Sequence, residues 1–501
     1  MEARRRETGT VRNGVQLITY VDRFGGGDLD VLADLLAGPL DGAFTGVHLL
    51  PFYPPYDGAD AGFDPIDHTR VDPRLGDWEA LGRLAAHLDV TADLIVNHIS
   101  SESPRFLDFL QHGTNSGHGG MFLSYSDVFP EGATEEELLR IYRPRPGLPF
   151  TAFTLGDGSR RLMWTTFTPA QVDLDLSDET ARGYLLEVLD RHSAAGVAQV
   201  RLDAVGYAVK TAGTSCFMTS ETRGFMRDLG DEIHRRGMES LLEIHSHHSD
   251  QIEIARLMDR VYDFALPPLI LHGLYTGSAA ALCDWLRISP RNAVTVLDTH
   301  DGIGVIDVGP DDTRPGLLSA PQLDELVEGI HAATAGQSRL ATGIAASNLD
   351  LYQVNSTYFS AVGEDDDRYL LARLIQFLAP GVPQVYYAGL LALPNDMDLL
   401  ARTGVGRDIN RPYLSRDEIE HHLRRPVVRR LLDLIRFRNT HPAFNGDFQL
   451  RRGGDDHLLV LEWEAADAAI EARIDLAGVE FELDVSAGGE KETISDWEGL
   501  A

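Results

Sequence analysis

Residues 199–207 read Gln-Val-Arg-Leu-Asp-Ala-Val-Gly-Tyr. Val200 and Leu202 alternate with Arg201 and Asp203, and this period of two predicts a β-strand. Charged residues are rarely buried unless they are paired or take part in chemistry. Taken alone, the stretch favours the simpler interpretation, a buried ion pair that fixes the end of a strand.

Predicted strands and helices alternate on both sides of this stretch. The predicted strands are 15–20, 46–52, 91–98, 199–207, 240–245, 261–266, 293–301 and 381–387. The predicted helices are 28–40, 77–88, 179–195, 221–236, 251–260, 279–288, 368–378 and 427–439. Strands that are each followed by a helix predict an α/β fold, a (β/α)8 TIM barrel. The alternative is a doubly wound open sheet, but no Gly-x-Gly-x-x-Gly follows the first strand.

Three regions depart from this alternation. Residues 99–178 are rich in Gly, Pro and Ser and too long for a structureless loop, so they predict an inserted small domain after the third strand. Residues 302–366 predict a second, irregular insertion after the seventh strand. From residue 444 to the end, strictly alternating runs predict a C-terminal antiparallel β-domain. The catalytic barrel would then comprise residues 1–98, 179–301 and 367–443.

The composition is that of a globular protein, with 43% hydrophobic and 24% charged residues. A formal net charge of −33 argues against nucleic acid or an anionic membrane as partner, because both need basic patches. No apolar run is long enough to span a bilayer, and no apolar region follows the N-terminal arginines as in a signal peptide. Cys216 and Cys283 are too few for a disulfide scaffold. We therefore expect a cytoplasmic protein.

Lys210 and Lys491 are the only lysines in the chain. Two explanations stay open for this acidic, lysine-poor composition. One is adaptation to high salt, in which an acidic surface keeps the protein in solution. The other is a coding bias towards arginine.

The ends of the predicted strands are unusually polar, and barrel enzymes place their catalytic groups there. In chain order these ends carry Asn97, His98, Arg201, Asp203, Glu243, His245, His300 and Asp301. Each could be an ordinary ion pair or a strand-end hydrogen bond. Three carboxylates that converge from different strands repel one another, and proteins tolerate that cost where chemistry needs it. Paired carboxylates suit glycosidic bond chemistry, in which one protonates a leaving oxygen and another attacks or stabilises an oxocarbenium-like centre.

A metal site is the weaker interpretation of the same region. The run His245-Ser-His-His248 could ligate zinc, but adjacent histidines on one loop usually do not converge, and no cysteine is near them in the sequence. We expect neither a metal nor a cofactor.

Four segments in chain order carry a resemblance to a known family. They are Asp93-Leu-Ile-Val-Asn-His98, Val200-Arg-Leu-Asp203, Leu242-Glu243 and Asp298-Thr-His-Asp301. These segments resemble the four signature regions of the α-amylase family, glycoside hydrolase family 13. The resemblance implies that Asp203 is the nucleophile, Glu243 the general acid/base and Asp301 the transition-state stabiliser. It also implies that His98, Arg201 and His300 hold the glucosyl ring. Protonation of a leaving group by Glu243 near neutral pH would require a raised pKa.

Within that family the chain closely resembles the sucrose phosphorylases. The matching segments are 15–20, 57–68, 141–150, 201–207, 348–353 and 406–411, and the similarity runs from about residue 15 to 439. The resemblance implies that Asp60 and Arg407 bind glucosyl hydroxyls, that Phe63 is an apolar platform and that Gln171 lies near the site. It also implies a mobile loop that carries Asp350, Leu351, Tyr352 and Gln353. Arg145 is the best candidate for binding phosphate, although Arg143 and Arg145 could equally solvate a proline-rich loop.

The resemblance implies retaining phosphorolysis of sucrose to α-D-glucose 1-phosphate and D-fructose through a covalent glucosyl-enzyme. The expected partners are therefore sucrose, inorganic phosphate and the two products, and a homodimer is suggested. Alternatives are a phosphorylase for sucrose 6′-phosphate, glucosylglycerol or glucosylglycerate, a sucrose hydrolase or transglucosidase, and a non-catalytic partner of a membrane transporter. Gly206-Tyr207 stands where many α-amylases carry Lys-His, whose His helps to bind calcium, so no calcium requirement is implied.

Overall fold

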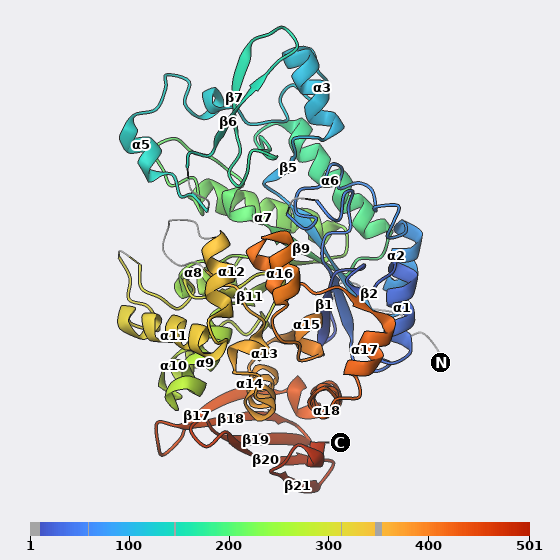
Figure 1. The fold of residues 1–501 in the computed structure, drawn as a ribbon, viewed down its shortest axis with the longest axis vertical. Helices are drawn as coiled ribbons and strands as arrows, with labels where there is room; N and C mark the ends of the chain where they lie inside the picture. The colour runs from blue at the N-terminus through green and yellow to red at the C-terminus, as the bar shows by residue number, and fades with distance from the viewer. Residues whose placement is uncertain (1–10, 59, 145–146, 312, 346–352, 501) are drawn as a thin grey trace.

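The structure is a computed structural model that describes residues 11–500 except 59, 145–146, 312 and 346–352. Its centre is a closed barrel of parallel strands in the order β1-β15-β12-β11-β10-β9-β4-β3 (Figure 1). The strands are β1 (Gln16–Thr19), β3 (Gly46–Leu49), β4 (Asp89–Ile95), β9 (Gln199–Asp203), β10 (Glu239–Leu242), β11 (Arg260–Asp263), β12 (Ala293–Thr295) and β15 (Val382–Tyr386). The (β/α)8 barrel is confirmed, and the doubly wound open sheet is wrong.

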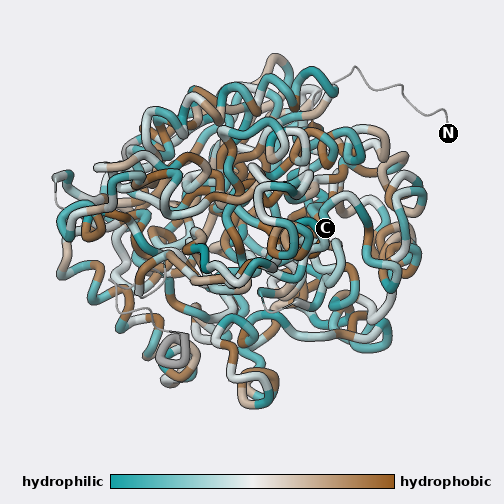
Figure 2. Tube along the Cα trace, turned by 90° about the horizontal axis from the view of Figure 1, so that it is seen from above, coloured by the Kyte–Doolittle hydropathy of each residue, from teal (hydrophilic) through white to brown (hydrophobic). Residues whose placement is uncertain are grey.

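Helices surround the barrel and turn their apolar faces towards it. They are α1 (Leu29–Ala37), α2 (Trp78–Ala85), α6 (Glu179–Ala194), α7 (Ser220–Arg235), α8 (His248–Ile254), α9 (Leu266–Thr276), α10 (Ala280–Ile288), α14 (Asp366–Leu378) and α18 (Pro426–Thr440). In α6, Leu185, Val188 and Leu189 are buried on one face, as their spacing predicts. Figure 2 shows hydrophilic and hydrophobic segments alternating along these peripheral helices. The sequence missed α9, whose first turn contains Pro267 and Pro268, a position where proline is tolerated.

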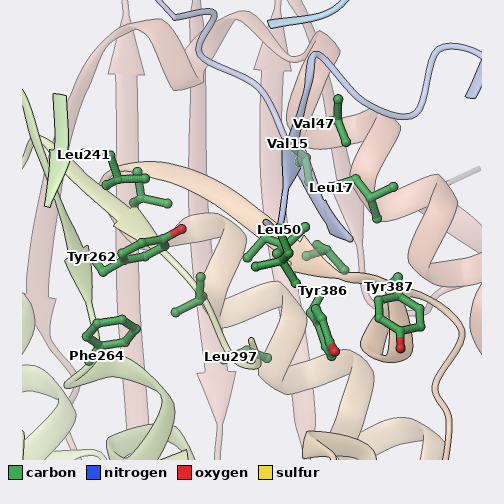
Figure 3. Packing of buried hydrophobic residues seen from close by; sticks show 14 of the residues in the cluster. Val15, Leu17, Val47, Leu50, Leu241, Tyr262, Phe264, Leu297, Tyr386 and Tyr387 are labelled. Atoms are coloured by element: carbon green, nitrogen blue, oxygen red, sulfur yellow. The ribbon is translucent and has the colours of Figure 1, made fainter. Parts of the chain in front are cut away.

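Apolar and aromatic side chains from the strands form one buried core. Figure 3 shows part of this packing, with Leu17, Val47, Leu241, Tyr262 and Tyr386 supplied by five different strands. Each of these side chains is almost completely buried. The strand ends that carry the polar residues therefore rise from a closely packed scaffold.

The strands are shorter than the sequence predicts at the ends that matter most. β10 ends at Leu242 and β12 at Thr295, whereas the predicted strands run to 245 and 301. Glu243 and Asp301 therefore lie on the loops that follow these strands. Loops at the carboxyl ends of the strands are where barrel enzymes carry their chemistry.

The segment between β4 and α6 lies above the barrel in Figure 1. Its elements are β5 (His98–Ser100), α3 (Pro104–His112), η1 (Gly113–Asn115), α4 (Tyr125–Val128), α5 (Glu135–Arg140), β6 (Phe150–Thr154), β7 (Arg160–Trp164) and β8 (Gln171–Asp173). β5 pairs with β8 and β6 with β7, both antiparallel. The β5–β8 pair brings His98 opposite Asp173 and Ser100 opposite Gln171, so this unit contributes directly to the strand-end region.

The prediction that residues 302–366 are irregular is wrong. Their described part contains β13 (Ile303–Gly304), α11 (Ala320–Ala333), α12 (Gln337–Ala345), β14 (Gln353–Val354) and α13 (Tyr358–Ala361). α11 begins with a capping box between Ser319 and Gln322 and buries Leu326 and Ile330. The capping box and the apolar face favour a helix here. The prediction missed it because the Gly and Pro residues before it are typical of loops.

The remaining elements are short strands and helices outside the eight barrel strands, together with the C-terminal sheet. They are β2 (Phe24–Gly25), η2 (Val205–Tyr207), α15 (Tyr387–Leu390), α16 (Met397–Thr403), η3 (Gly406–Asn410), β16 (Leu414–Ser415), α17 (Arg416–His422), η4 (Pro442–Asn445), β17 (Asp447–Arg452), β18 (Leu458–Ala465), β19 (Ala468–Asp475), β20 (Glu480–Ala487), β21 (Glu490–Ile494) and η5 (Glu498–Leu500). β17 to β21 form one antiparallel sheet in sequence order, as predicted. Among the described residues, we find no helix with the length and apolar character needed to cross a lipid bilayer.

Candidate active site

Asp203 is the last residue of β9 and lies at the centre of the polar strand ends. Val96 N donates to the Asp203 backbone oxygen at 3.1 Å, which fixes this strand end against β4. Ala204 follows in the left-handed region with φ 53°, so the chain turns sharply directly after the carboxylate. Gly206 is needed in this turn, because a Cβ there would lie 2.7 Å from the Phe217 ring.

Arg201 lies two residues earlier on the same strand and contacts several carboxylates. Its Nη1 is 3.2 Å from Asp203 Oδ1 and also donates to Asp93 Oδ1, and its Nη2 is 3.9 Å from Glu243 Oε1. Burial raises the pKa of Asp203 well above its usual range, Arg201 lowers it, and Glu243 raises it further. Arg201 is the guanidinium closest to the Asp203 carboxylate, and its positive charge favours the ionised form of Asp203.

Asp93, inside the barrel on β4, is a supporting residue. It lies in the motif 93–98, but no role was predicted for it from the sequence. Its Oδ2 is 3.0 Å from His48 Nε2, and the phenol of Tyr262 is 3.2 Å from His48 Nδ1. Burial raises the pKa of Asp93, but Arg201 and His48 outweigh it and lower this pKa to about 2. The signal available in the sequence was one charged residue in the middle of an otherwise β-prone strand.

Glu243 follows β10 directly, and its backbone N–H lies 3.4 Å from Leu202 O of β9. Its carboxylate faces two cationic or titratable groups, because Oε1 is 3.9 Å from Arg201 Nη2 and 3.8 Å from His245 Nε2. A carboxyl group that is partly exposed at the mouth of a barrel and close to a second carboxyl can exchange a proton with a bound molecule.

Asp301 completes the set of three carboxylates. Arg407 Nη1 lies 2.8 Å from Asp301 Oδ1, and Arg411 Nη2 lies 3.8 Å from the same oxygen. Burial raises the pKa of Asp301, but Arg407, His300 and Arg411 outweigh burial and hold the pKa below its usual range. Asp301 is therefore a fixed negative charge beside the other two carboxyl groups.

The segment 406–411 makes hydrogen bonds to the backbone of the loop that carries Asp301. Asn410 Nδ2 donates to Asp301 O at 2.8 Å, and Arg411 Nε donates to His300 O at 2.8 Å. Burial lowers the pKa of His300 to about 3, so this imidazole is neutral near pH 7. Arg411 and Asn410 are further supporting residues that the sequence did not single out.

Most of the residues expected to bind the glucosyl unit lie close to one another. Gln171 Nε2 lies 3.2 Å from Asp60 Oδ2, from Phe63 O and from His98 Nε2. The ring of Phe63 stacks on His300 with 4.8 Å between the centroids, and the Arg201 guanidinium lies 5.5 Å from the Phe63 centroid. An apolar ring surrounded by directed polar groups is a suitable surface for one sugar ring.

Gln353 lies next to His245. Its Nε2 is 3.1 Å from His245 Nε2, and its Oε1 accepts from Gly302 N at 3.2 Å. Arg145, Asp350, Leu351 and Tyr352 lie outside the described residues, so their predicted roles stay predictions.

Lys210 follows Tyr207 by three residues, in the loop after β9. Its ammonium group donates to Asn97 Oδ1 at 2.7 Å and to Tyr207 O, and lies 2.8 Å from Asp173 Oδ2. The Lys210 and Asp173 side chains are both almost completely buried. This buried ion pair links the ends of β4 and β8 to the loop after β9.

Within the part of the chain that the structure describes, one group could hold a metal: Glu243, His245 and Asp301, whose ligand atoms lie within 4.8 Å of one another. Two carboxylates and an imidazole are an acceptable set of zinc ligands. Glu243 and Asp301 are also two of the three carboxylates to which the family resemblance gives roles in glycosidic chemistry, and Arg407 Nη1 already lies 2.8 Å from Asp301 Oδ1. The geometry therefore suits acid–base and nucleophilic chemistry without a metal.

Comparison with known proteins gives one family and several close relatives. Residues 19–258 match the family model described as alpha amylase, catalytic domain. The chain is 59% identical to the sucrose phosphorylase of Agrobacterium vitis, over 90% of this chain and 93% of the relative. It is 53% identical to the sucrose phosphorylase of Bifidobacterium adolescentis, over 90% of each chain.

A solved structure supports the same relationship. The crystal structure of sucrose 6F-phosphate phosphorylase from Thermoanaerobacter thermosaccharolyticum is similar with a TM-score of 0.89 and 37% identity. The match covers 97% of this chain and 98% of that one. The barrel, the units inserted into it and the C-terminal sheet are thus covered by one relative.

Proposed function

This chain belongs to the α-amylase family, glycoside hydrolase family 13, and from that premise we propose that it is a sucrose phosphorylase. The observation that carries the proposal is the convergence of Asp203, Glu243 and Asp301 around Arg201 and Arg407. The high identity to sucrose phosphorylases over nearly the whole chain supports sucrose as the donor.

The first step transfers the glucosyl unit of sucrose to the enzyme. Asp203 attacks the anomeric carbon, and Glu243 gives its proton to the oxygen of the departing fructose. Arg201 favours this distribution of charge because it lies closer to Asp203 than to Glu243. Asp301, kept ionised by Arg407, stabilises the positive charge that develops on the sugar ring.

The second step transfers the glucosyl unit to phosphate. A phosphate oxygen attacks the anomeric carbon of the ester, Asp203 leaves as a carboxylate, and Glu243 accepts a proton if the nucleophile still carries one. Two inversions at the same carbon give net retention, so the product is α-D-glucose 1-phosphate. A retaining mechanism needs the two carboxyl groups about 5 Å apart, and their shared contact with one guanidinium agrees with this requirement.

The proposal assigns the glucosyl side of the site to Asp60, Phe63, His98, Gln171, His300 and Arg407. It assigns phosphate and fructose binding to Arg145, Asp350, Leu351, Tyr352 and Gln353. The contacts of Gln171 with Asp60, Phe63 and His98 support the first group. For the second group, the support is the family resemblance together with the position of Gln353 next to His245.

We further propose that the protein works in the cytoplasm as a homodimer. Its sequence has only two cysteines, Cys216 and Cys283, which are too few for a disulfide scaffold and agree with a reducing compartment. Light scattering coupled to size-exclusion chromatography tests the dimer, and a mass of one chain would contradict it.

The direct test incubates the enzyme with sucrose, with and without saturating phosphate, and quantifies glucose 1-phosphate and free glucose. We expect α-D-glucose 1-phosphate as the main product when phosphate is present, and none from Asp203→Asn. Free glucose as the main product at saturating phosphate would indicate a hydrolase. Higher kcat/KM with sucrose 6′-phosphate, glucosylglycerol or glucosylglycerate would assign the chain to one of those related phosphorylases.

A further inference from the structure

A second Asp–His pair, distinct from His48–Asp93, lies beside the proposed acid/base. His245 Nδ1 is 3.0 Å from Asp307 Oδ2, and the Asp307 side chain is completely buried. His245 follows Glu243 by two residues, whereas Asp307 comes from the loop after β13, in the segment inserted after the seventh barrel strand. Two segments far apart in the chain therefore build this pair.

The surroundings hold both partners in one arrangement. Asp307 Oδ1 accepts from Ser246 N at 3.2 Å and from Gln251 Nε2 at 3.0 Å. The imidazole of His245 stacks on Phe264, with 3.9 Å between centroids and 16° between planes. Gly304 makes the close approach possible, because a Cβ there would lie 2.4 Å from Asp307 Oδ2 and 3.2 Å from His245 Nδ1.

Because ionised Asp307 can only accept, His245 Nδ1 carries a hydrogen, and Nε2 is the atom that faces the site. His245 Nε2 lies 3.8 Å from Glu243 Oε1 and 3.1 Å from Gln353 Nε2. The charged groups that face His245 are Asp307, Glu243 and Asp301. Burial lowers the pKa of His245, but these three carboxylates outweigh burial and raise it above its ordinary value.

The two steps of the proposed reaction change the charge next to His245. When Glu243 protonates the leaving fructose, it becomes a carboxylate 3.8 Å from His245, and this negative charge favours an imidazolium. The imidazolium donates from both nitrogens, so Gln353 would then turn its amide oxygen towards Nε2. The next molecule to enter is phosphate, an anion that needs a local positive charge in a chain of net charge −33.

We propose that Asp307 is a positioning residue, which holds His245 beside Glu243 with Nδ1 protonated so that His245 supplies positive charge in the phosphate step. The assignment rests on the proposed function. It implies that loss of Asp307 harms transfer to phosphate more than transfer to water, because water is neutral and needs no cation.

The experiment is a double-mutant cycle with Asp307→Asn and His245→Gln. Each variant is measured for phosphorolysis and for sucrose hydrolysis, with thermal melting as the check on folding. We expect kcat/KM for phosphate to fall about 10- to 100-fold in either single variant, as for loss of a hydrogen bond to a charged group, with a smaller effect on hydrolysis. Asp307→Asn should cost little more once His245 is Gln, because it acts through His245. The matched control is Asp108→Asn, which changes a half-exposed aspartate near His112 on α3 and should alter neither reaction.

The pH profile gives a readout that a merely structural role would not move. The alkaline limb of kcat/KM for phosphate should shift to lower pH in Asp307→Asn, because the carboxylate that favours protonated His245 is gone. Equal losses with phosphate and water, or an equal cost of Asp307→Asn with and without His245, would overturn the assignment while leaving the proposed function intact. A wild-type enzyme that forms no glucose 1-phosphate would overturn both.

Discussion

Arg201 forms the ion pair that was expected at the end of the fourth strand, and it also lies close to two further carboxylates. The pair is present, but the guanidinium contacts buried Asp93 as well as Asp203, and it lies 3.9 Å from Glu243. Carboxylates this close repel one another, so a central cation is needed for them to coexist. The charge distribution around Arg201 also separates the nucleophile from the acid, because Asp203 is closer to the guanidinium.

At this scale we predict that Arg145→Ala impairs phosphorolysis more than hydrolysis of sucrose. Phosphate needs a cationic partner, whereas water does not. The matched control is Arg143→Ala on the same loop, whose guanidinium donates to Gly147 O at 3.1 Å. The measurement is the ratio of glucose 1-phosphate to glucose at fixed phosphate concentration. Equal loss of both activities in Arg145→Ala, or the same change in Arg143→Ala, would contradict a phosphate-binding role.

At the scale of elements, Lys210 links β4, β8 and the turn after β9. We predict that Lys210→Ala lowers the melting temperature strongly, because Asp173 would be left buried without its partner. Breaking a buried ion pair in this way costs about 3–5 kcal/mol. Lys491→Ala, on the exposed strand β21, is the control and should melt like the wild type. Indistinguishable melting curves for the two variants would show that the buried pair does not stabilise the protein.

His192 on α6 gives a prediction for the dependence of stability on pH. Burial lowers its pKa to about 4, and its Nε2 lies 2.7 Å from Tyr53 OH. The unfolded chain has an ordinary His pKa near 6.5 and binds more protons between pH 6.5 and 4, so the free energy of unfolding falls as pH falls through this window. The loss amounts to about 3 kcal/mol at pH 4.

The measurement is chemical denaturation of the wild type and of His192→Gln from pH 7 to pH 4.5. The variant should lose less stability over this range, whereas His87→Gln, at an exposed histidine, should behave like the wild type. A pH dependence in His192→Gln as steep as in the wild type would mean that other groups cause the acid destabilisation.

The elements themselves were predicted to different extents, for physical reasons. The barrel strands carry a strong local signal, because buried parallel strands are continuous apolar or β-prone runs. α11 and α12 were missed because Gly and Pro residues before them resemble loop sequence. The three carboxylates could be located from motifs at strand ends. Asp307 could not, because it meets His245 across 62 residues of sequence, and such contacts are decided by tertiary packing.

For the whole molecule, a net charge of −33 predicts a dependence of stability on salt. Mutual repulsion destabilises the compact state, and the Debye length shortens from about 30 Å at 0.01 M to about 8 Å at 0.15 M ionic strength. We expect the melting temperature to rise as NaCl is added over this range. A melting temperature independent of salt would contradict this prediction. Unchanged activity after dialysis to low salt would in addition favour the coding-bias explanation over adaptation to high salt.

The central claim is that the barrel presents Asp203 as the residue that forms a covalent bond to glucose. The measurement is mass spectrometry of Glu243→Gln incubated with α-D-glucosyl fluoride, whose leaving group needs little help from an acid, with Asp203→Asn as control. We predict a mass increase of one glucosyl unit on the peptide that contains residues 199–207, and its release by phosphate as α-D-glucose 1-phosphate. An adduct on another residue, or β-D-glucose 1-phosphate as product, would contradict the account.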